Sequence, residues 1–202
     1  MKLIISATSP YVRKVRVMIR EANLLDNVEE VSVITSPLDS HPEAVAANPM
    51  GKIPSLVRTD GPAIHDSRVI TRYLDDHAGT GLYPTSRLWE VLTLEATADA
   101  ILDASVSMAY EIKMRPENMQ YDVWIEAQWV KVDRSLASIS ERWMSHLSGP
   151  LDAAQIAVAC ALSYIDLRHD ARNWRAKNKA LADWHAEFCK RDSMIATVPP
   201  AV

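Results

Sequence analysis

The sequence is poor in cysteine and has no long apolar run. Its two cysteines, Cys160 and Cys189, form neither a CxxC motif nor a spacing typical of metal ligands, and the six histidines are scattered, so no metal is assigned. Both thiols fall in helical apolar patterns, which fits a reducing, cytoplasmic setting. No stretch of about 18 apolar residues exists, so no membrane span is expected. The apolar start after Met1-Lys2 is too short for a secretory signal.

The sequence also lacks an excess of positive charge. It has 22 basic and 26 acidic residues, a net charge of −4. Up to residue 80 the chain carries 9 basic and 10 acidic residues, and after it 13 and 16. Neither part is basic, which argues against nucleic acid as the main partner. With 202 residues, the chain is long enough for one large domain or two small ones.

The first part of the chain alternates strand and helix patterns. Residues 2–6 read as a buried strand, and Ser9-Pro10 reads as a cap followed by proline at the first helical position. A second strand surrounds Val31 and Val33, and a hairpin turns at Asp60-Gly61. A short helix is expected over 42–47. The full order is strand, helix, strand, helix, strand, strand, helix, which resembles a thioredoxin-like domain.

The second part of the chain is helical throughout. Two glycines and a proline between 79 and 84 indicate a linker. We therefore expect an α/β domain over 1–79, a linker over 80–86 and an all-α bundle over 87–202. The apolar spacing predicts helices from 88 to about 113, from 129 to 147, from 152 to 166 and around 181–188. Asp152 and Gln155 have the spacing of a capping box, and the large aromatic residues read as core.

A proline-rich loop is the most informative segment. The run from Asn48 to Pro54, Asn-Pro-Met-Gly-Lys-Ile-Pro, leads into an apolar strand. Pro54 is a candidate for a cis peptide bond, which would turn the backbone N–H and C=O of Ile53 outward to pair with an extended peptide. A trans turn proline is the ordinary alternative. Downstream, Asp66-Ser67 precedes a helix, where a carboxylate, a hydroxyl and free N–H groups can hold an ammonium and a carboxylate together.

These two motifs together resemble the glutathione-binding half of the glutathione S-transferase family, and the resemblance covers essentially the whole chain. It implies a thioredoxin-like domain followed by a helical domain, with glutathione as co-substrate and no metal. By this resemblance the loop before Pro54 holds the cysteinyl backbone of glutathione, and Asp66-Ser67 holds its γ-glutamyl end. Lys52 is a candidate partner for the glycine carboxylate, or is simply exposed, whereas Asn48 reads as a loop-shaping residue.

The chemistry of such an enzyme requires a thiolate at neutral pH. A free thiol is only a few per cent ionised there, so the protein must supply hydrogen bonds and positive potential. Ser9, at the start of the first helix, is placed for this, and the family has Ser or Cys just before the proline. A plain helix cap is the alternative, and Ser6 and Thr8 are rivals. Arg13 and Lys14 either add positive potential or form a solvated helix face.

The second substrate would be a small electrophile held by the start of the helical domain. Met108, Tyr110, Met114 and Arg115 lie where the resemblance places the pocket wall. Methionine suits promiscuous apolar surfaces, and Tyr110 and Arg115 could orient a polar substrate. The expected activity is conjugation of glutathione through Ser9. A non-catalytic binding or regulatory protein of the same fold is the alternative. A reductase or peroxidase is disfavoured, because residue 9 is not cysteine.

The resemblance also implies a homodimer. Two-fold pairing would use the hairpin and helix over 60–75 and the helices around 88–100 and 124–135. The many large apolar residues, Trp89 and Trp129 among them, supply weak support, because a bundle core could absorb them all.

Overall fold

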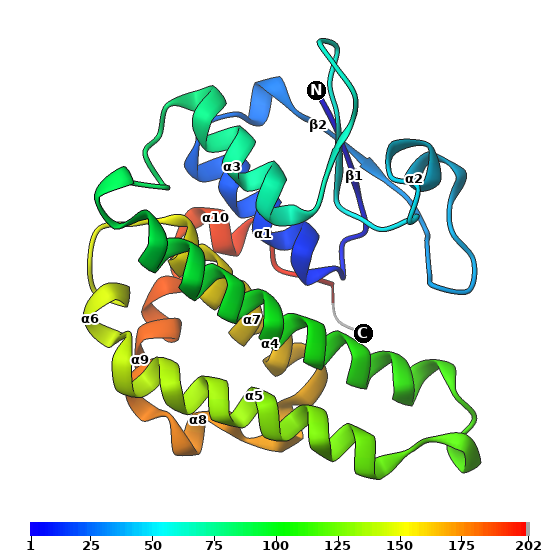
Figure 1. The fold of residues 1–202 in the computed structure, drawn as a ribbon, viewed down its shortest axis with the longest axis vertical. Helices are drawn as coiled ribbons and strands as arrows, with labels where there is room; N and C mark the ends of the chain where they lie inside the picture. The colour runs from blue at the N-terminus through cyan, green and yellow to red at the C-terminus, as the bar shows by residue number, and fades with distance from the viewer. Residues whose placement is uncertain (201–202) are drawn as a thin grey trace. The chain divides into compact units, whose positions relative to one another are not determined.

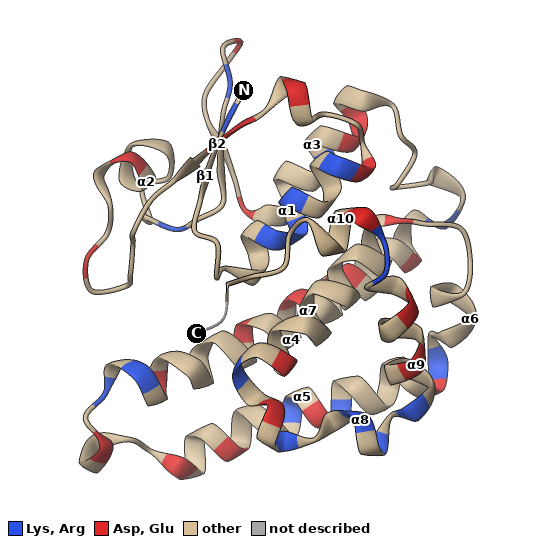
Figure 2. Cartoon of the chain, turned by 180° about the vertical axis from the view of Figure 1, so that it is seen from behind, with Lys and Arg blue, Asp and Glu red and all other residues tan. Residues whose placement is uncertain are grey.

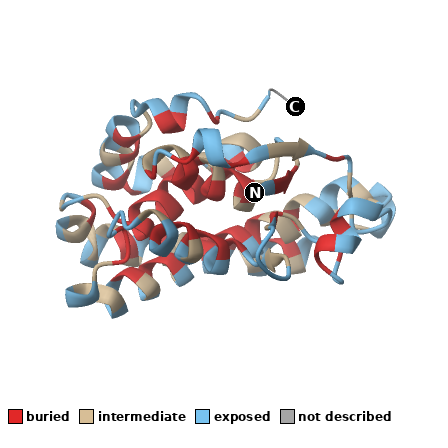
Figure 3. Ribbon diagram, turned by 90° about the horizontal axis from the view of Figure 1, so that it is seen from above, coloured by how far each residue is buried: buried red, intermediate tan, exposed pale blue. Residues whose placement is uncertain are grey.

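The computed structural model describes residues 1–200, and these form two compact units (Figure 1). The first unit comprises Met1–Leu88 together with the chain from Arg191 onward, and the second comprises Trp89–Lys190. Most helices have a buried side and an exposed side (Figure 3).

The first unit is built on a mixed four-stranded sheet of order β2-β1-β3-β4. β1 runs parallel to β2 and antiparallel to β3, and β3 pairs antiparallel with β4. Leu3 and Leu56 face each other across the β1–β3 ladder and are both fully buried, so the sheet is anchored at its centre. The strands are β1 Lys2–Ile5, β2 Glu29–Ser32, β3 Ser55–Val57 and β4 Ile64–His65.

Three helices and one tail segment complete the first unit. α1 packs against α3, and α2 packs against β3. Each helix has a polar residue at its start and proline or serine at its first position, as helix N-termini favour. The tail helix α10 packs on α1, so residues 191–200 group with the first unit, whereas the sequence pattern placed them in the helical domain. The bounds are α1 Pro10–Glu21, α2 Pro42–Ala47, α3 Ser67–Ala78 and α10 Asp192–Ile195.

The second unit is helical, and α7 is its most buried helix. The predicted capping box is present: Asp152 Oδ1 accepts from the N–H of Ala154 and Gln155, and Gln155 Oε1 accepts from the N–H of Asp152. Cys160 and its neighbours on α7 are buried nearly all round. The helices are α4 Leu88–Met114, which continues from the first unit, α5 Asp122–Arg142, α6 Met144–Leu147, α7 Ala153–His169, α8 Trp174–Lys177 and α9 Lys179–Phe188. Single 3-10 turns occupy Leu25–Asn27, Thr85–Arg87, Glu117–Met119 and Asp170–Arg172.

The predicted helix over 129–147 is wrong in its bounds. α5 begins earlier, at Asp122, and ends at Arg142, after which Trp143 separates it from the short α6. The apolar spacing continued through Trp143, but this side chain is only partly buried and its ring makes an edge-to-face contact with the ring of His146. None of the helices in residues 1–200 is both long and apolar enough to span a bilayer.

Candidate functional site

Ser9 occupies the N-cap of α1, directly after the turn that follows β1. Its Oγ accepts the N–H of Val12 at 3.3 Å, and its own N–H donates to the carbonyl oxygen of Ser6 at 3.1 Å. Pro10 is the first helical residue, as the sequence predicts. Ser9 is half-buried, so its hydroxyl stands at the positive end of a twelve-residue helix, a place that favours an anion.

Arg13 and Lys14 are buried, so the solvated-face interpretation is wrong for them. Both lie on α1, which carries several basic residues (Figure 2), and their exposed fractions are 6% and 0%. The Arg13 Nη2 donates to the carbonyl oxygen of Met194 at 3.1 Å. Arg16, by contrast, lies at the half-exposed side and pairs with Glu30 through Nε at 2.9 Å. The buried charges place positive potential along the helix that Ser9 begins.

Asn48 shapes the loop before Pro54, as predicted. Its Nδ2 donates to the carbonyl oxygen of Lys52 at 3.1 Å, and its Oδ1 accepts the N–H of Met50 at 3.0 Å. Gly51 has φ +63°, and a Cβ there would lie 2.7 Å from Ser40 Oγ, so glycine is required. The Lys52 side chain points into solvent at the surface, which leaves its ammonium available to a carboxylate.

At Ile53-Pro54 the groups that could meet a ligand belong to the backbone and not to the side chains. The peptide bond between the two residues is cis, the isomer that the sequence favoured. The Ile53 side chain packs against a cluster that includes Ile4 and Ala44, whereas Pro54 is buried. Within residues 1–200, the N–H and C=O of Ile53 take part in none of the turn, loop or sheet hydrogen bonds. These groups have the character of an unpaired strand edge.

Asp66 caps α3 in a conformation that is rare for a residue with a side chain. Its φ is 70° and its ψ is 126°, and its Oδ1 accepts the N–H of Arg68 at 2.9 Å. The Arg68 guanidinium also binds both carboxylate oxygens, at 3.1 and 3.0 Å. These hydrogen bonds lower the pKa of Asp66, although burial opposes them, and Lys14 adds a smaller electrostatic contribution. Ser67, the first residue of α3, is buried. A strained, ionised residue at a helix start is typical of a ligand site.

The predicted pocket-wall residues differ from one another. Met108 is fully buried and belongs to the core of the second unit. Arg115 is exposed and pairs with Glu111 at 2.9 Å, while Met114 is half-buried. Tyr110 is 41% exposed, and partial burial raises the pKa of its phenol. Two of the four, Tyr110 and Arg115, are exposed and polar, and the Arg115 guanidinium is already engaged by Glu111.

Sequence reasoning missed two neighbours of Tyr110 on α7. Burial raises the pKa of Tyr164 to about 12, and the Arg168 guanidinium opposes that rise. Arg168 also acts electrostatically on Tyr110. Tyr164 and Arg168 are one turn apart on α7, but Tyr110 is far from both in sequence, so no local pattern marks the three as a group. Arg68 was missed for a different reason, because its position after the predicted Asp66-Ser67 pair reads as an ordinary exposed helix residue.

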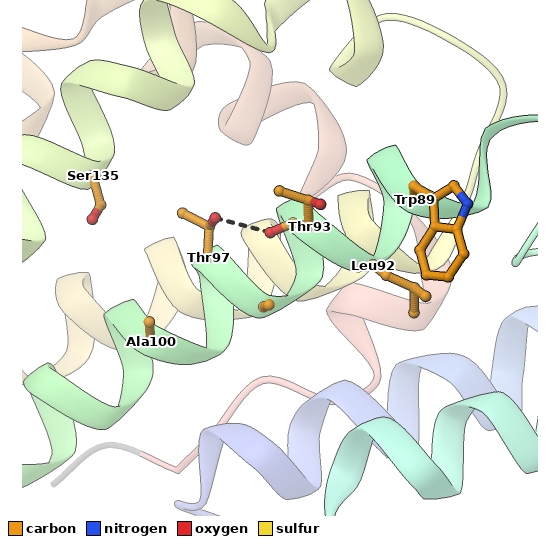
Figure 4. A pocket seen from close by; sticks show the side chains of 7 residues that line it. Trp89, Leu92, Thr93, Thr97, Ala100 and Ser135 are labelled. Atoms are coloured by element: carbon orange, nitrogen blue, oxygen red, sulfur yellow. Dashed lines mark hydrogen bonds between the residues drawn. The ribbon is translucent and has the colours of Figure 1, made fainter.

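A shallow pocket lies on the second unit, lined by α4 and by Ser135 of α5 (Figure 4). Trp89, at the start of α4, is 77% exposed. Thr97 Oγ1 donates to the carbonyl oxygen of Thr93, so this hydroxyl has a partner within its own helix. The lining is Trp89, Leu92, Thr93, Ala96, Thr97, Ala100 and Ser135.

The fold is a thioredoxin-like domain joined to a helical domain. Residues 8–77 match the family model described as the glutathione S-transferase N-terminal domain, and residues 122–187 match the C-terminal domain of the same family. The chain is 30% identical, over 99% of both sequences, to the "Uncharacterized GST-like protein YibF" of Escherichia coli (strain K12). The chain therefore belongs to the glutathione S-transferase family.

Solved structures agree with this assignment. A glutathione transferase family member from Pseudomonas fluorescens Pf-5, with bound glutathione, is 40% identical, covers 98% of both chains and superposes with a TM-score of 0.96. A glutathione S-transferase from Methylobacillus flagellatus KT, with glutathione bound, is 36% identical over 98% of this chain and 99% of its own, with a TM-score of 0.86.

Proposed function

We propose that the protein binds reduced glutathione on its first unit and activates the thiol for attack on a small electrophile in the cytoplasm. The observation that carries this proposal is the unpaired backbone of Ile53 beside the cis Pro54. An extended peptide can pair with that N–H and C=O in the manner of an added strand. The ionised carboxylate of Asp66 and the first N–H groups of α3 then suit the ammonium and carboxylate of a γ-glutamyl end. Lys52 is free to meet the remaining carboxylate.

Relatives support the choice of ligand. The two bacterial relatives described above, at 40% and 36% identity, hold glutathione in their structures. The Pseudomonas fluorescens protein has also been solved with S-(propanoic acid)-glutathione, a glutathione whose sulfur carries a substituent. Glutathione as co-substrate is therefore the ligand that both the local chemistry and the relatives favour.

The proposed role of Ser9 is to stabilise the glutathione thiolate. Its hydroxyl hydrogen is available to a ligand, because the hydroxyl oxygen, and not its hydrogen, is used by the N–H of Val12. The positive end of α1 and the buried cations Arg13 and Lys14 add potential that favours an anion. In this proposal the thiolate attacks the electrophile, with Tyr110 and Arg115 as candidate contacts to the second substrate.

A non-catalytic binding protein is the second candidate. It is favoured by one observation, the bond from Val12 N–H to Ser9 Oγ, which already gives the serine a structural use as a cap. Glutathione binding without turnover, with any of a panel of electrophiles, would favour this second candidate over the first.

The deciding experiment is calorimetric titration of reduced glutathione into the full chain. We expect binding at millimolar ligand or below. Asp66→Asn should weaken it by about 1.5–3 kcal/mol, the worth of a hydrogen bond to a charged group. Asp26→Asn is the matched control, since Asp26 is an exposed aspartate of the same unit outside both motifs, and it should change nothing. Absence of binding by the wild type at millimolar glutathione rules out both candidates.

We also propose that the protein is a homodimer. Support comes from the exposed Trp89 and the pocket lined by α4 and α5, which lie in the predicted ranges 88–100 and 124–135. An exposed apolar face of this kind is typical of a surface that pairs with a partner.

A further inference from the structure

A second group of reactive side chains lies within the helical unit, where α9 packs on α7. Cys189 is the C-cap residue directly after α9, and it is half-buried. Its Sγ lies 3.2 Å from Nε2 of His185 and 3.9 Å from Oγ of Ser163. The Ser163 Oγ lies 2.9 Å from the same Nε2. Three side chains from two helices thus meet around one imidazole nitrogen.

The proton on this imidazole is fixed by an arginine. The Arg175 Nη2 lies 2.9 Å from His185 Nδ1. A guanidinium can only donate, so Nδ1 must accept, and the hydrogen of the neutral ring is on Nε2. The same Nη2 donates to Asp166 Oδ2 at 2.5 Å, and Arg175 Nε donates to Asp166 Oδ1 at 3.3 Å. The carboxylate therefore holds the guanidinium in the position that orients His185.

The donors in this cluster converge on the sulfur. The Nε2–H of His185 has three acceptors within reach: Ser163 Oγ, Cys189 Sγ and the carbonyl oxygen of Ala159 at 3.2 Å. When Ser163 accepts from Nε2, its own O–H is available to Sγ. A chain of hydrogen-bond donors therefore runs from the Arg175 guanidinium through His185 and Ser163 to Sγ of Cys189. Donors at a sulfur favour the thiolate over the thiol. His185 is only 3% exposed, whereas Ser163 and Cys189 are half-buried, so these bonds are partly shielded from water, which strengthens them, and Cys189 remains partly accessible.

We propose that Cys189 is a reactive thiol that exchanges with low-molecular-weight disulfides such as glutathione disulfide. The Cys189 thiolate attacks one sulfur of the disulfide, the disulfide bond breaks, and a new bond joins Sγ to that sulfur. The other half leaves as a thiolate and takes a proton from water. No further oxidant is needed, because the incoming disulfide is reduced as the cysteine is oxidised. His185 and Ser163 are positioning residues that stabilise the attacking sulfur. The reaction is independent of the Ser9 site.

Cys160 provides an internal comparison. It is also a thiol, lies on α7 and is fully buried. Both cysteines are present in one chain and meet the same reagent, so a difference in their rates reports their surroundings. A buried thiol without access reacts slowly, whereas a half-buried thiol with donors at its sulfur reacts fast.

The test is incubation of the full chain with glutathione disulfide, followed by intact mass and peptide mapping. We expect one glutathionyl adduct per chain, on Cys189, that is removed by a reducing agent. The rate relative to urea-unfolded protein should rise as pH falls from about 8 to about 6, because an ordinary thiol near pKa 8.5 loses its thiolate over this range. A rate ratio that does not change with pH, no adduct, or equal labelling of Cys160 would each overturn the proposal.

A variant pair tests the role of the donors. Ser163→Ala should slow the exchange at Cys189 by about 2- to 10-fold, the effect of one lost hydrogen bond. Ser107→Ala, which removes a half-buried serine on α4 that bonds only the carbonyl of Ala104, should leave the rate unchanged. Equal rates in both variants would overturn the assigned role of Ser163. Ser9→Ala should leave the exchange rate unaltered, so loss of the proposed transferase activity and loss of this reactivity are separate results.

Discussion

The carboxylate of Asp75 accepts the backbone N–H of Leu82, at 2.7 Å, and thereby ties the segment after α3 back onto the helix. Oδ2 of Asp75 accepts the N–H of Tyr83 at 3.2 Å, and Thr80 Oγ1 donates at 2.5 Å to Oδ1, the oxygen that also binds Leu82. The chain can turn here because Gly79, with φ +64°, ends α3 in the left-handed conformation. The one buried carboxylate of Asp75 therefore binds two backbone N–H groups of the predicted linker.

Asp75→Ala should destabilise the protein by about 1.5–3 kcal/mol, because two buried N–H groups lose a charged acceptor. Asp76→Ala is the matched control: it makes the same change one position along α3, at an exposed residue. Urea unfolding of the two variants measures the difference. Equal free energies of unfolding would show that Asp75 contributes no more than a surface residue.

The pH dependence of stability should include a contribution from Glu21. Arg191 binds both oxygens of this carboxylate at 2.8 Å, and this hydrogen bonding, assisted by Ser193, lowers the pKa of Glu21 below its ordinary 4.5, against the effect of burial. Because the native pKa is the lower one, the stabilisation is complete above pH 4.5 and is lost as pH falls through the native pKa.

Glu21→Gln should therefore lower the free energy of unfolding near neutral pH, and the gap from wild type should close under acid conditions. Arg191 is partly exposed, so solvent screening limits the effect to about 0.5–1 kcal/mol. Thermal unfolding across the acid range measures it. Glu29→Gln, at an exposed glutamate that pairs with Lys2 at 3.9 Å, is the control and should show a smaller gap. A gap for Glu21→Gln that persists at the lowest pH contradicts the electrostatic origin.

Ser9→Ala should lower turnover with glutathione by about 10- to 1,000-fold, as expected for a lost anion-stabilising donor, and should move the pH–rate profile to higher pH. It should also cost about 0.5–2 kcal/mol of stability through the lost helix cap. The control is Ser36→Ala, which removes another hydroxyl that accepts a backbone N–H, in the loop before α2. If turnover and pH profile are unchanged in Ser9→Ala, Ser6 or the backbone carries the role.

Local sequence patterns predicted the parts of this fold that depend on local physics. The cap at Ser9, the capping box from Asp152 to Gln155 and the helix over 42–47 are short-range hydrogen-bond and proline effects, and all three are present. The loop over 48–54 could be predicted for the same reason, because prolines restrict the backbone wherever they occur and a glycine allows the positive φ found at Gly51.

Features that depend on tertiary contacts could not be predicted from local sequence patterns. Arg13 and Lys14 were compatible with a solvated helix face because charged side chains are rarely buried. Arg13 is buried near Met194, which binds its guanidinium and comes from the far end of the chain. The break at Trp143 and the return of the tail to the first unit have no local signal of their own. The positive φ of Asp66 was also hidden, since aspartate at a helix start normally adopts an extended backbone.

The proposed homodimer predicts a mass of two chains in light scattering at micromolar concentration, against 22.6 kDa for one chain. Trp89→Glu should shift the mass to one chain, because a charge would be placed on the exposed apolar face at the start of α4. Leu38→Glu adds the same charge at an 81% exposed leucine outside the proposed surfaces, and should leave the dimer intact. A wild type with the mass of a single chain would refute the dimer. A dimer that survives Trp89→Glu would instead remove α4 from the interface.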